Sequence, residues 1–114
     1  MTKKTPFSLS GKIAVITGFG APKDALSNGG AIARLFAKQG AVIEGLDISA
    51  EDAQNTVEAI IKAGGQAFFT SGDATVEADI DSWIKSVLQR HSRIDILINN
   101  VGQSERLTPE TADT

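Results

Sequence analysis

Short apolar runs alternate with amphipathic stretches along most of this chain. The apolar runs fall at residues 13–16, 41–46, 66–70 and 94–98, and each has the length of a β-strand. Between them, apolar residues recur with the spacing of one helix face. Alternation of strands with helices is typical of βαβ units arranged around a parallel sheet. We therefore predict four parallel strands separated by three helices.

Each predicted helix carries an apolar stripe that should pack against the sheet. In the first helix, from about residue 28 to 39, the stripe comprises Ile32, Leu35 and Phe36. In the second it comprises Val57, Ile60 and Ile61. The third helix has the clearest stripe, made of Ile80, Trp83, Ile84, Val87 and Leu88. This regular spacing predicts that the tryptophan belongs to the core and is not a ligand-stacking surface.

Polar residues mark the starts of the second and third helices. Ser49 precedes the second helix and Asp52 stands three residues later, which predicts a reciprocal capping box. Thr75 is the predicted cap of the third helix. A cap supplies hydrogen-bond acceptors for the first backbone N–H groups, which have no partner within the helix.

Three charged residues inside the predicted elements have structural interpretations. Glu44 and Asp95 interrupt apolar strands and are predicted to lie on the sheet surface or in ion pairs. His91 follows Arg90 at the end of the third helix, where positive charge complements the helix dipole. We therefore assign none of the three to catalysis.

The order of the elements predicts the arrangement of the sheet. Right-handed crossovers place the first three strands in the order 3-2-1 and put the fourth strand on the other side of the first. The chain is therefore predicted to be an α/β protein with a Rossmann-type, doubly wound parallel sheet that is incomplete. Residues 1–10 are predicted to be a tail and residues 11–114 a partial dinucleotide-binding domain. Ligands of such sheets bind where the strand order reverses, outside the carboxyl ends of the strands.

Composition excludes several classes of function. The chain has 114 residues and a net charge of -3, so nothing suggests a nucleic-acid partner or an anionic membrane surface. It has no cysteine and one histidine, which excludes disulfides and a multi-histidine metal site within the chain. The basic start lacks the apolar run of a signal peptide, and no run could span a bilayer. We predict a cytoplasmic protein with no metal.

A glycine-containing loop follows the first strand and leads into the first helix. Such a loop brings backbone close to a pyrophosphate, and the helix N-terminus favours the anion. Gly18, Gly20 and Gly29 are in place, but Lys23 stands where the third glycine of the G-x-G-x-x-G pattern belongs. The loop is also longer than the standard turn. Taken alone, it is equally consistent with nucleotide binding and with a connection that happens to contain glycines.

An acidic residue after the second strand favours nucleotide binding. At this position the carboxylate of Asp47 can accept hydrogen bonds from the adenosine ribose hydroxyls. It would also repel a 2′-phosphate, and no Arg or Lys follows it directly. We therefore predict NAD in preference to NADP, although Lys23 could reach a 2′-phosphate.

Three motifs in order resemble the short-chain dehydrogenase/reductase family. They are Thr17-Gly18 with Gly29, then Asp73, then Asn99-Asn100-Val101-Gly102. The family's motifs are Thr-Gly-x-x-x-Gly-x-Gly, an Asp-Val pair after the third strand and Asn-Asn-Ala-Gly after the fourth. Here Ser27 replaces the middle glycine and several residues are inserted after Gly20. The resemblance covers nearly the whole chain.

This resemblance implies a role for each matching residue. Asp47 would hold the adenosine ribose, and Asn99 would brace the central strands. Asp73 and Ala74 would flank the adenine, and Asn100 and Gly102 would lie beside the cofactor's ribose. The cofactor pyrophosphate would be bordered by Gly18, Phe19, Gly20, Ala21, Asn28 and Gly29.

The resemblance also implies a reaction whose catalytic residues this chain does not contain. The family's catalytic serine and Tyr-x-x-x-Lys pair would lie beyond Thr114, and the chain has no tyrosine. We expect the complete enzyme to interconvert a secondary alcohol and a ketone, to act on a small molecule and to form a homodimer or homotetramer. We expect the 114-residue chain alone to be inactive. The alternatives are a non-catalytic dinucleotide-binding module, an inactive remnant and, within the family, an enoyl reductase, since those enzymes also lengthen the glycine loop.

Overall fold

The computed structural model describes residues 8–100 and contains four strands and three helices in strict alternation. The strands are β1 (Ile13–Thr17), β2 (Val42–Asp47), β3 (Gln66–Ser71) and β4 (Ile96–Ile98). The helices are α1 (Asn28–Lys38), α2 (Ala50–Lys62) and α3 (Glu77–His91). The predicted elements are confirmed, and β4 is shorter than its apolar run suggested.

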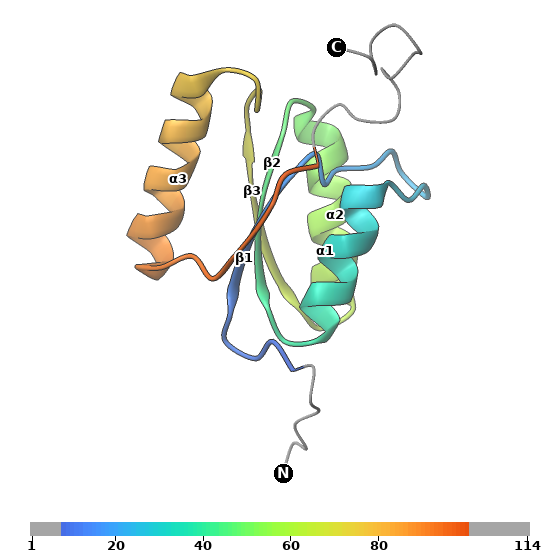
Figure 1. Cartoon of the computed structure of the whole chain (residues 1–114). Coiled ribbons are helices and arrows are strands. Elements are labelled where there is room, and N and C mark those ends of the chain that lie inside the picture. The colour runs from blue at the N-terminus through green and yellow to red at the C-terminus, as the bar shows by residue number, and fades with distance from the viewer. Residues whose placement is uncertain (1–7, 101–114) are drawn as a thin grey trace, which may run out of the picture.

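The four strands form one parallel sheet in the order β3-β2-β1-β4. This confirms the predicted Rossmann-type order, with its reversal between β1 and β4. Helices α1 and α2 cover one face of the sheet and α3 covers the other (Figure 1). The carboxyl ends of all the strands lie at the upper edge in that view, where α1 also begins. The topology thus brings the loops after β1, β2 and β4 to one place.

Two apolar clusters fill the layers between the helices and the sheet. On the α1/α2 face, Ile16 and Ile43 pack with Phe19, Ala33 and Ile60. On the α3 face, Trp83 and Val87 pack against Val15 and Leu46, and Trp83 is almost fully buried. The core assignment of the tryptophan is confirmed. Continuous apolar strands are therefore explained by burial on both faces of the sheet.

One residue of each predicted apolar stripe is exposed instead of buried. Leu35, Ile61 and Leu88 have exposed fractions of 56%, 55% and 42%. In each helix the buried face is centred on neighbours one or more positions away, such as Ala33, Val57 and Trp83. A helix turns by about 100° per residue, so Leu35 points about 160° away from Ala33, Ile61 about 40° from Val57 and Leu88 about 140° from Trp83.

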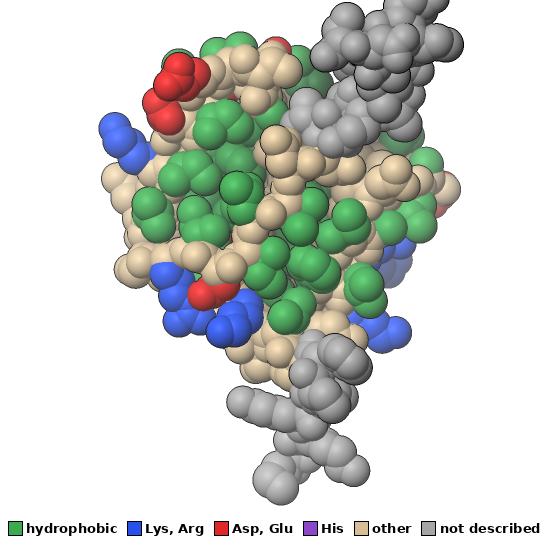
Figure 2. All heavy atoms as spheres, viewed as in Figure 1, with side chains coloured by type: hydrophobic (Ala, Val, Ile, Leu, Met, Phe, Trp, Pro, Cys, Tyr) green, Lys and Arg blue, Asp and Glu red, His purple; other side chains and the backbone are tan. Residues whose placement is uncertain are grey.

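The edge of the sheet at β4 is apolar and open within the described part of the chain. Leu97 is 64% exposed, whereas Ile96 and Ile98 pack against the α1/α2 core. Hydrophobic side chains gather on both sides of this front strand, toward α1 and toward α3 (Figure 2). A parallel strand is normally covered on both faces, and Leu97 leaves one face of β4 uncovered within the described residues.

The helix caps differ from two of the predictions. Ser49 caps α2, because its Oγ accepts a hydrogen bond from the Asp52 N–H at 3.1 Å. The reciprocal half of the capping box comes from Asp47, whose Oδ1 accepts from the Ser49 N–H at 3.0 Å. The prediction that Thr75 caps α3 is wrong, since the N-cap is Val76 and has no side-chain cap. The Thr75 hydroxyl instead donates to Asp73.

Glu44 lies in the core and not on the sheet surface, although it does form ion pairs. Its side chain is fully buried, and its Oε2 accepts from Arg90 Nη1 and contacts His91 Nε2, each at 2.7 Å. The Arg90 guanidinium also stacks over the Phe68 ring, 4.6 Å from its centroid. A buried carboxylate requires such partners because burial disfavours its charge. His91 is thus a structural residue that holds α3 to the sheet.

Asp95 joins the start of β4 to β1, and its pKa leads to a pH prediction. Its Oδ2 accepts from the Ile13 N–H at 2.8 Å and from Arg93 Nε at 2.9 Å. The Ile13 N–H, and after it Arg93, lower the pKa of Asp95 below its usual range. The resulting stability is present above the ordinary carboxyl pKa and is lost as pH falls through the lowered one.

We therefore expect Asp95→Asn to lower the urea midpoint at about pH 7 and to have a smaller effect at an acidic pH below the lowered pKa, where the native carboxyl is also protonated. Urea titrations of both proteins at the two pH values measure this. Asp81→Asn on the exposed side of α3 is the control and should show no such convergence. An equal loss at both pH values would assign the effect of Asp95→Asn to geometry and not to charge.

Candidate cofactor site

The ends of β1 and β4 are tied together by a short polar network. The Thr17 hydroxyl donates to Asn99 Oδ1 at 3.0 Å and accepts from the Asn100 N–H at 2.8 Å. The Asn100 side chain then donates to the Gly18 carbonyl oxygen at 3.1 Å. Asn99 therefore braces the central strands, as predicted. Asn100 is held directly beside the glycine loop, at the point where the strand order reverses.

Gly29 allows α1 to begin in contact with this network. A Cβ added to Gly29 would clash with the Gly18 carbonyl oxygen and would lie 2.6 Å from Asn100 Nδ2. Gly18 itself has a φ of +63° and a backbone that faces the Asn100 carbonyl. This left-handed conformation favours glycine. The structure thus brings Gly18, Gly29 and Asn100 together, and the two glycines are required by space and by backbone conformation.

The backbone donors of the loop divide into two sets. The N–H groups of Gly18, Gly20 and Ala21 donate to Leu46, Asp47 and Asp52 respectively. At the start of α1, the Gly30 N–H donates to the Ser27 hydroxyl. The N–H groups of Asn28 and Gly29 have no acceptor among residues 8–100. The helix start therefore offers open donors to an anion. Among the first loop residues, Phe19 also has an N–H with no acceptor among residues 8–100.

Asp47 lies at the end of β2, against the glycine loop. Its Oδ2 accepts from the Gly20 N–H at 2.9 Å, and its Oδ1 accepts from the Ser49 N–H at 3.0 Å. Each carboxylate oxygen has a second lone pair. The side chain therefore fixes the loop and can still accept a hydrogen bond from a ligand hydroxyl group. The sequence located this residue but gave no sign of its contact with the loop.

Asp73 lies at the turn after β3. It is partly exposed, and its Oδ1 accepts from the Thr75 hydroxyl at 2.7 Å and from the Thr75 N–H at 2.9 Å. These two hydrogen bonds lower the pKa of Asp73, the hydroxyl contributing more. Ala74 packs partly against the α3 core. Gly102, the remaining predicted site residue, lies outside the described residues.

Phe19 is a buried loop residue beneath β2. Its ring packs so closely on Gly45 that a Cβ at Gly45 would overlap it. The Thr56 hydroxyl donates to the Phe19 carbonyl oxygen at 3.0 Å, and Asn55 Nδ2 donates to the Ala21 carbonyl oxygen at 3.1 Å. Sequence reasoning missed Thr56 and Asn55. The glycine inside β2 was a visible signal, because glycine in a strand often marks a close approach.

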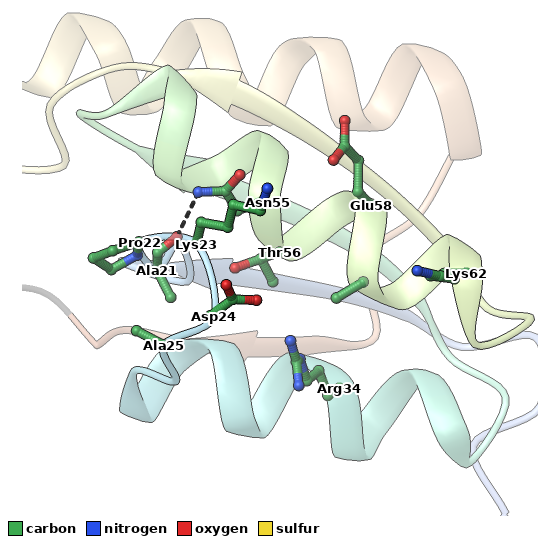
Figure 3. Close-up of a pocket in the computed structure, with 11 residues that line it drawn as sticks. Ala21, Pro22, Lys23, Asp24, Ala25, Arg34, Asn55, Thr56, Glu58 and Lys62 are labelled. Atoms are coloured by element: carbon green, nitrogen blue, oxygen red, sulfur yellow. Dashed lines mark hydrogen bonds between the residues drawn. The ribbon is translucent and has the colours of Figure 1, made fainter.

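A cavity of about 300 Å³ lies between the inserted loop residues and helices α1 and α2 (Figure 3). Among the predicted cofactor residues only Ala21 lines it. Lys23, which could reach a 2′-phosphate, and Asp24 line it from the loop, and Arg34 from α1. The cavity is therefore separate from the strand ends at which the strand order reverses, the position where ligands of such sheets bind.

Residues 8–100 contain neither a metal-binding cluster nor a membrane-spanning helix. No group of three or more His, Asp or Glu side chains in this range is arranged to hold a metal ion. No helix in the same range is long and apolar enough to cross a membrane.

Comparison with known proteins places this arrangement in a family. A family model described as "Enoyl-(Acyl carrier protein) reductase" matches residues 24–114. The short-chain dehydrogenase/reductase homolog YusS of Bacillus subtilis is 38% identical over 90 residues, which cover 78% of each chain. The chain therefore belongs to the short-chain dehydrogenase/reductase family.

Two longer relatives share the same region. The 7alpha-hydroxysteroid dehydrogenase of Escherichia coli K12 is 38% identical over 94 residues, which are 82% of this chain and 35% of that enzyme. The crystal structure of a metagenomic short-chain oxidoreductase in complex with NADP superposes with a TM-score of 0.76 at 30% identity. The match covers 92% of this chain and 48% of that one. The chain thus spans less than half of these two relatives.

Proposed function

We propose that this protein contains the cofactor-binding part of an NAD(P)-dependent oxidoreductase that interconverts a secondary alcohol and a ketone by hydride transfer to or from the nicotinamide. One observation carries the proposal. At the reversal of strand order, Gly29 places the start of α1 against Gly18 and Asn100, with two backbone N–H groups open to an anion. Membership of the family supports the reaction class.

Different residues of the site would bind different parts of the dinucleotide. The N–H groups of Asn28 and Gly29 would bind the pyrophosphate, aided by the helix dipole. Gly18, Phe19, Gly20 and Ala21 would shape the loop, since three of their four N–H groups are already bonded within the protein. Asp73 and Ala74 would flank the adenine, and Asn100 would lie beside the cofactor's ribose. The bound nicotinamide supplies the hydride chemistry.

Asp47 supports a preference for NAD. Its carboxylate keeps lone pairs for ribose hydroxyls and would repel a 2′-phosphate. Lys23 lines the cavity between α1 and α2, and no basic residue follows Asp47 directly. One relative binds NADP, so the preference is a property proposed for this chain and not for its family.

Replacing Asp47 by alanine is expected to weaken NAD binding about tenfold and NADP binding much less. The hydrogen bonds to the Gly20 and Ser49 N–H groups are lost for both cofactors, whereas a charge-assisted bond to the 2′-hydroxyl is lost only for NAD and a repulsion of the 2′-phosphate is removed only for NADP. Calorimetric titration of both cofactors measures the two constants. Asp81→Ala is the matched control, since this carboxylate is exposed on α3. An equal loss of affinity for both cofactors would show that Asp47 does not bind the ribose hydroxyls.

Catalysis is proposed to need residues that this chain does not contain. The family's proton donor is a tyrosine, and the chain has none. We propose that the 114-residue chain binds NAD without turning over an alcohol. Titration with NAD, followed by an assay of NADH formation with a panel of secondary alcohols, tests both parts. Failure to bind NAD would overturn the proposal, and NADH formation would overturn its second part.

Reduction of an enoyl group is the second candidate reaction. The description of the matching family model and the lengthened glycine loop both favour it. The same cofactor site would serve, since both reactions take hydride from a nicotinamide. Oxidation of NADH by an enoyl thioester, without activity on ketones, would decide for this candidate in the complete enzyme.

A further inference from the structure

Helix α2 forms hydrogen bonds with the lengthened loop between β1 and α1. A long loop has a larger conformational entropy than a short one, and fixing it opposes ligand binding. In this protein the loop residues Phe19 and Ala21 are nevertheless bonded to a helix that lies outside the glycine motif. These hydrogen bonds restrict the conformational freedom that the inserted residues add to the loop.

Thr56 fixes the first part of the loop. Its side chain is buried, and its hydroxyl donates to the Phe19 carbonyl oxygen at 3.0 Å. The Phe19 ring is fully buried against Gly45 in β2. Phe19 is therefore held by its ring and by its carbonyl group at once, and only the hydroxyl of Thr56 provides the second of these contacts.

Asn55 and the Asp52 carbonyl fix the next part of the loop. The Ala21 N–H donates to the Asp52 carbonyl oxygen at 3.1 Å, and the Ala21 carbonyl accepts from Asn55 Nδ2 at 3.1 Å. Both backbone groups of Ala21 are thus bonded to α2, as the close-up of this region shows for Asn55 (Figure 3). Gly20, between the two anchored residues, is held by Asp47.

We propose that Thr56 and Asn55 are positioning residues for the cofactor's pyrophosphate. Neither side chain is assigned to the ligand itself. They hold Phe19 and Ala21, and so order the loop that closes the site opposite the open N–H groups of α1. A loop ordered in advance binds more tightly, because less entropy is lost on binding. This inference rests on the proposed function, since it requires a dinucleotide at the site.

The test compares ligands with and without phosphates on the full 114-residue chain. We expect Thr56→Val to weaken ADP and NAD binding about tenfold, which corresponds to about 1.4 kcal/mol. Adenosine has no phosphate, so its affinity should change less than about twofold. Thr56→Ser keeps the hydroxyl and should restore binding. Asn55→Ala should weaken ADP in the same way, and Gln54→Ala on the exposed side of α2 is the control.

The outcomes separate this proposal from the proposed function. If the unaltered chain binds neither ADP nor NAD, the proposed function and this inference both fail. If it binds both and the variants bind equally well, only the positioning role is overturned. Equal losses for ADP and adenosine would also overturn it, because they would indicate general damage to the fold. Amide hydrogen exchange without ligand gives a second readout, and we expect faster exchange for Gly20 and Ala21 in both variants.

Discussion

Gly29→Ala is expected to abolish measurable dinucleotide binding and to lower the free energy of unfolding by about 1–3 kcal/mol. The added methyl group would clash with the Gly18 carbonyl and crowd the Asn100 side chain. Both neighbours are fixed by hydrogen bonds, so α1 must move away from β1 and β4. That movement carries the open N–H groups of α1 away from the ligand. Urea unfolding and NAD titration measure the two effects.

Gly64→Asn is the matched glycine substitution outside the site. Gly64 has a φ of +96°, but a Cβ there would meet nothing within 4 Å. Asparagine tolerates the left-handed region better than other side chains do. We expect a loss of at most about 1 kcal/mol and unchanged NAD affinity. Unaltered NAD binding by Gly29→Ala would contradict the packing argument and the proposed pyrophosphate site.

Removing both partners of Glu44 is expected to destabilise the fold by about 3–5 kcal/mol. In the double variant Arg90→Ala, His91→Ala, the fully buried carboxylate would have no cation within reach among the described residues. Even in the unaltered protein, its Oε1 has no hydrogen-bond partner within residues 8–100. Urea unfolding with an unchanged m-value would assign the loss to stability and not to a change in the denatured state.

Glu44→Gln should cost less than the double variant. It removes the buried charge, and the half-exposed Arg90 side chain can turn toward water. Arg93→Ala provides the surface comparison, because exposed ion pairs contribute at most about 1 kcal/mol. A larger loss in Glu44→Gln than in the double variant would show that the three side chains matter for packing and not for charge.

The parts of the fold that depend on local pattern were predictable from the sequence. Apolar runs and helical spacing determined the order of the elements, and right-handed crossovers determined the sheet order. The residues at the strand ends followed from the same pattern, because carboxyl ends of parallel strands meet at one edge. Asn99 and Trp83 were assigned correctly for these reasons. The roles of the predicted ligand residues remain predictions.

The features that were not predicted depend on contacts between distant parts of the chain. Glu44 was expected near the surface because its partner Arg90 lies 46 residues away. Thr56 was missed since its acceptor, the Phe19 carbonyl, is 37 residues distant. The wrong prediction for Thr75 has a local cause. Its hydroxyl can bond either to the backbone at the start of α3 or to the side chain of Asp73, two residues earlier. The side chain bonds Asp73 in a turn instead of capping α3.

The hydrogen bonds between Thr17 and Asn99 and between Gly18 and Asn100 join residues 82 positions apart. Contacts of such sequence separation form late in folding, because a long loop must close before they contribute. The proposed cofactor site is therefore incomplete in a chain that has folded only as far as β3. Under the proposed function, cofactor affinity would report completed folding, and free cofactor would selectively stabilise chains in which β4 has docked.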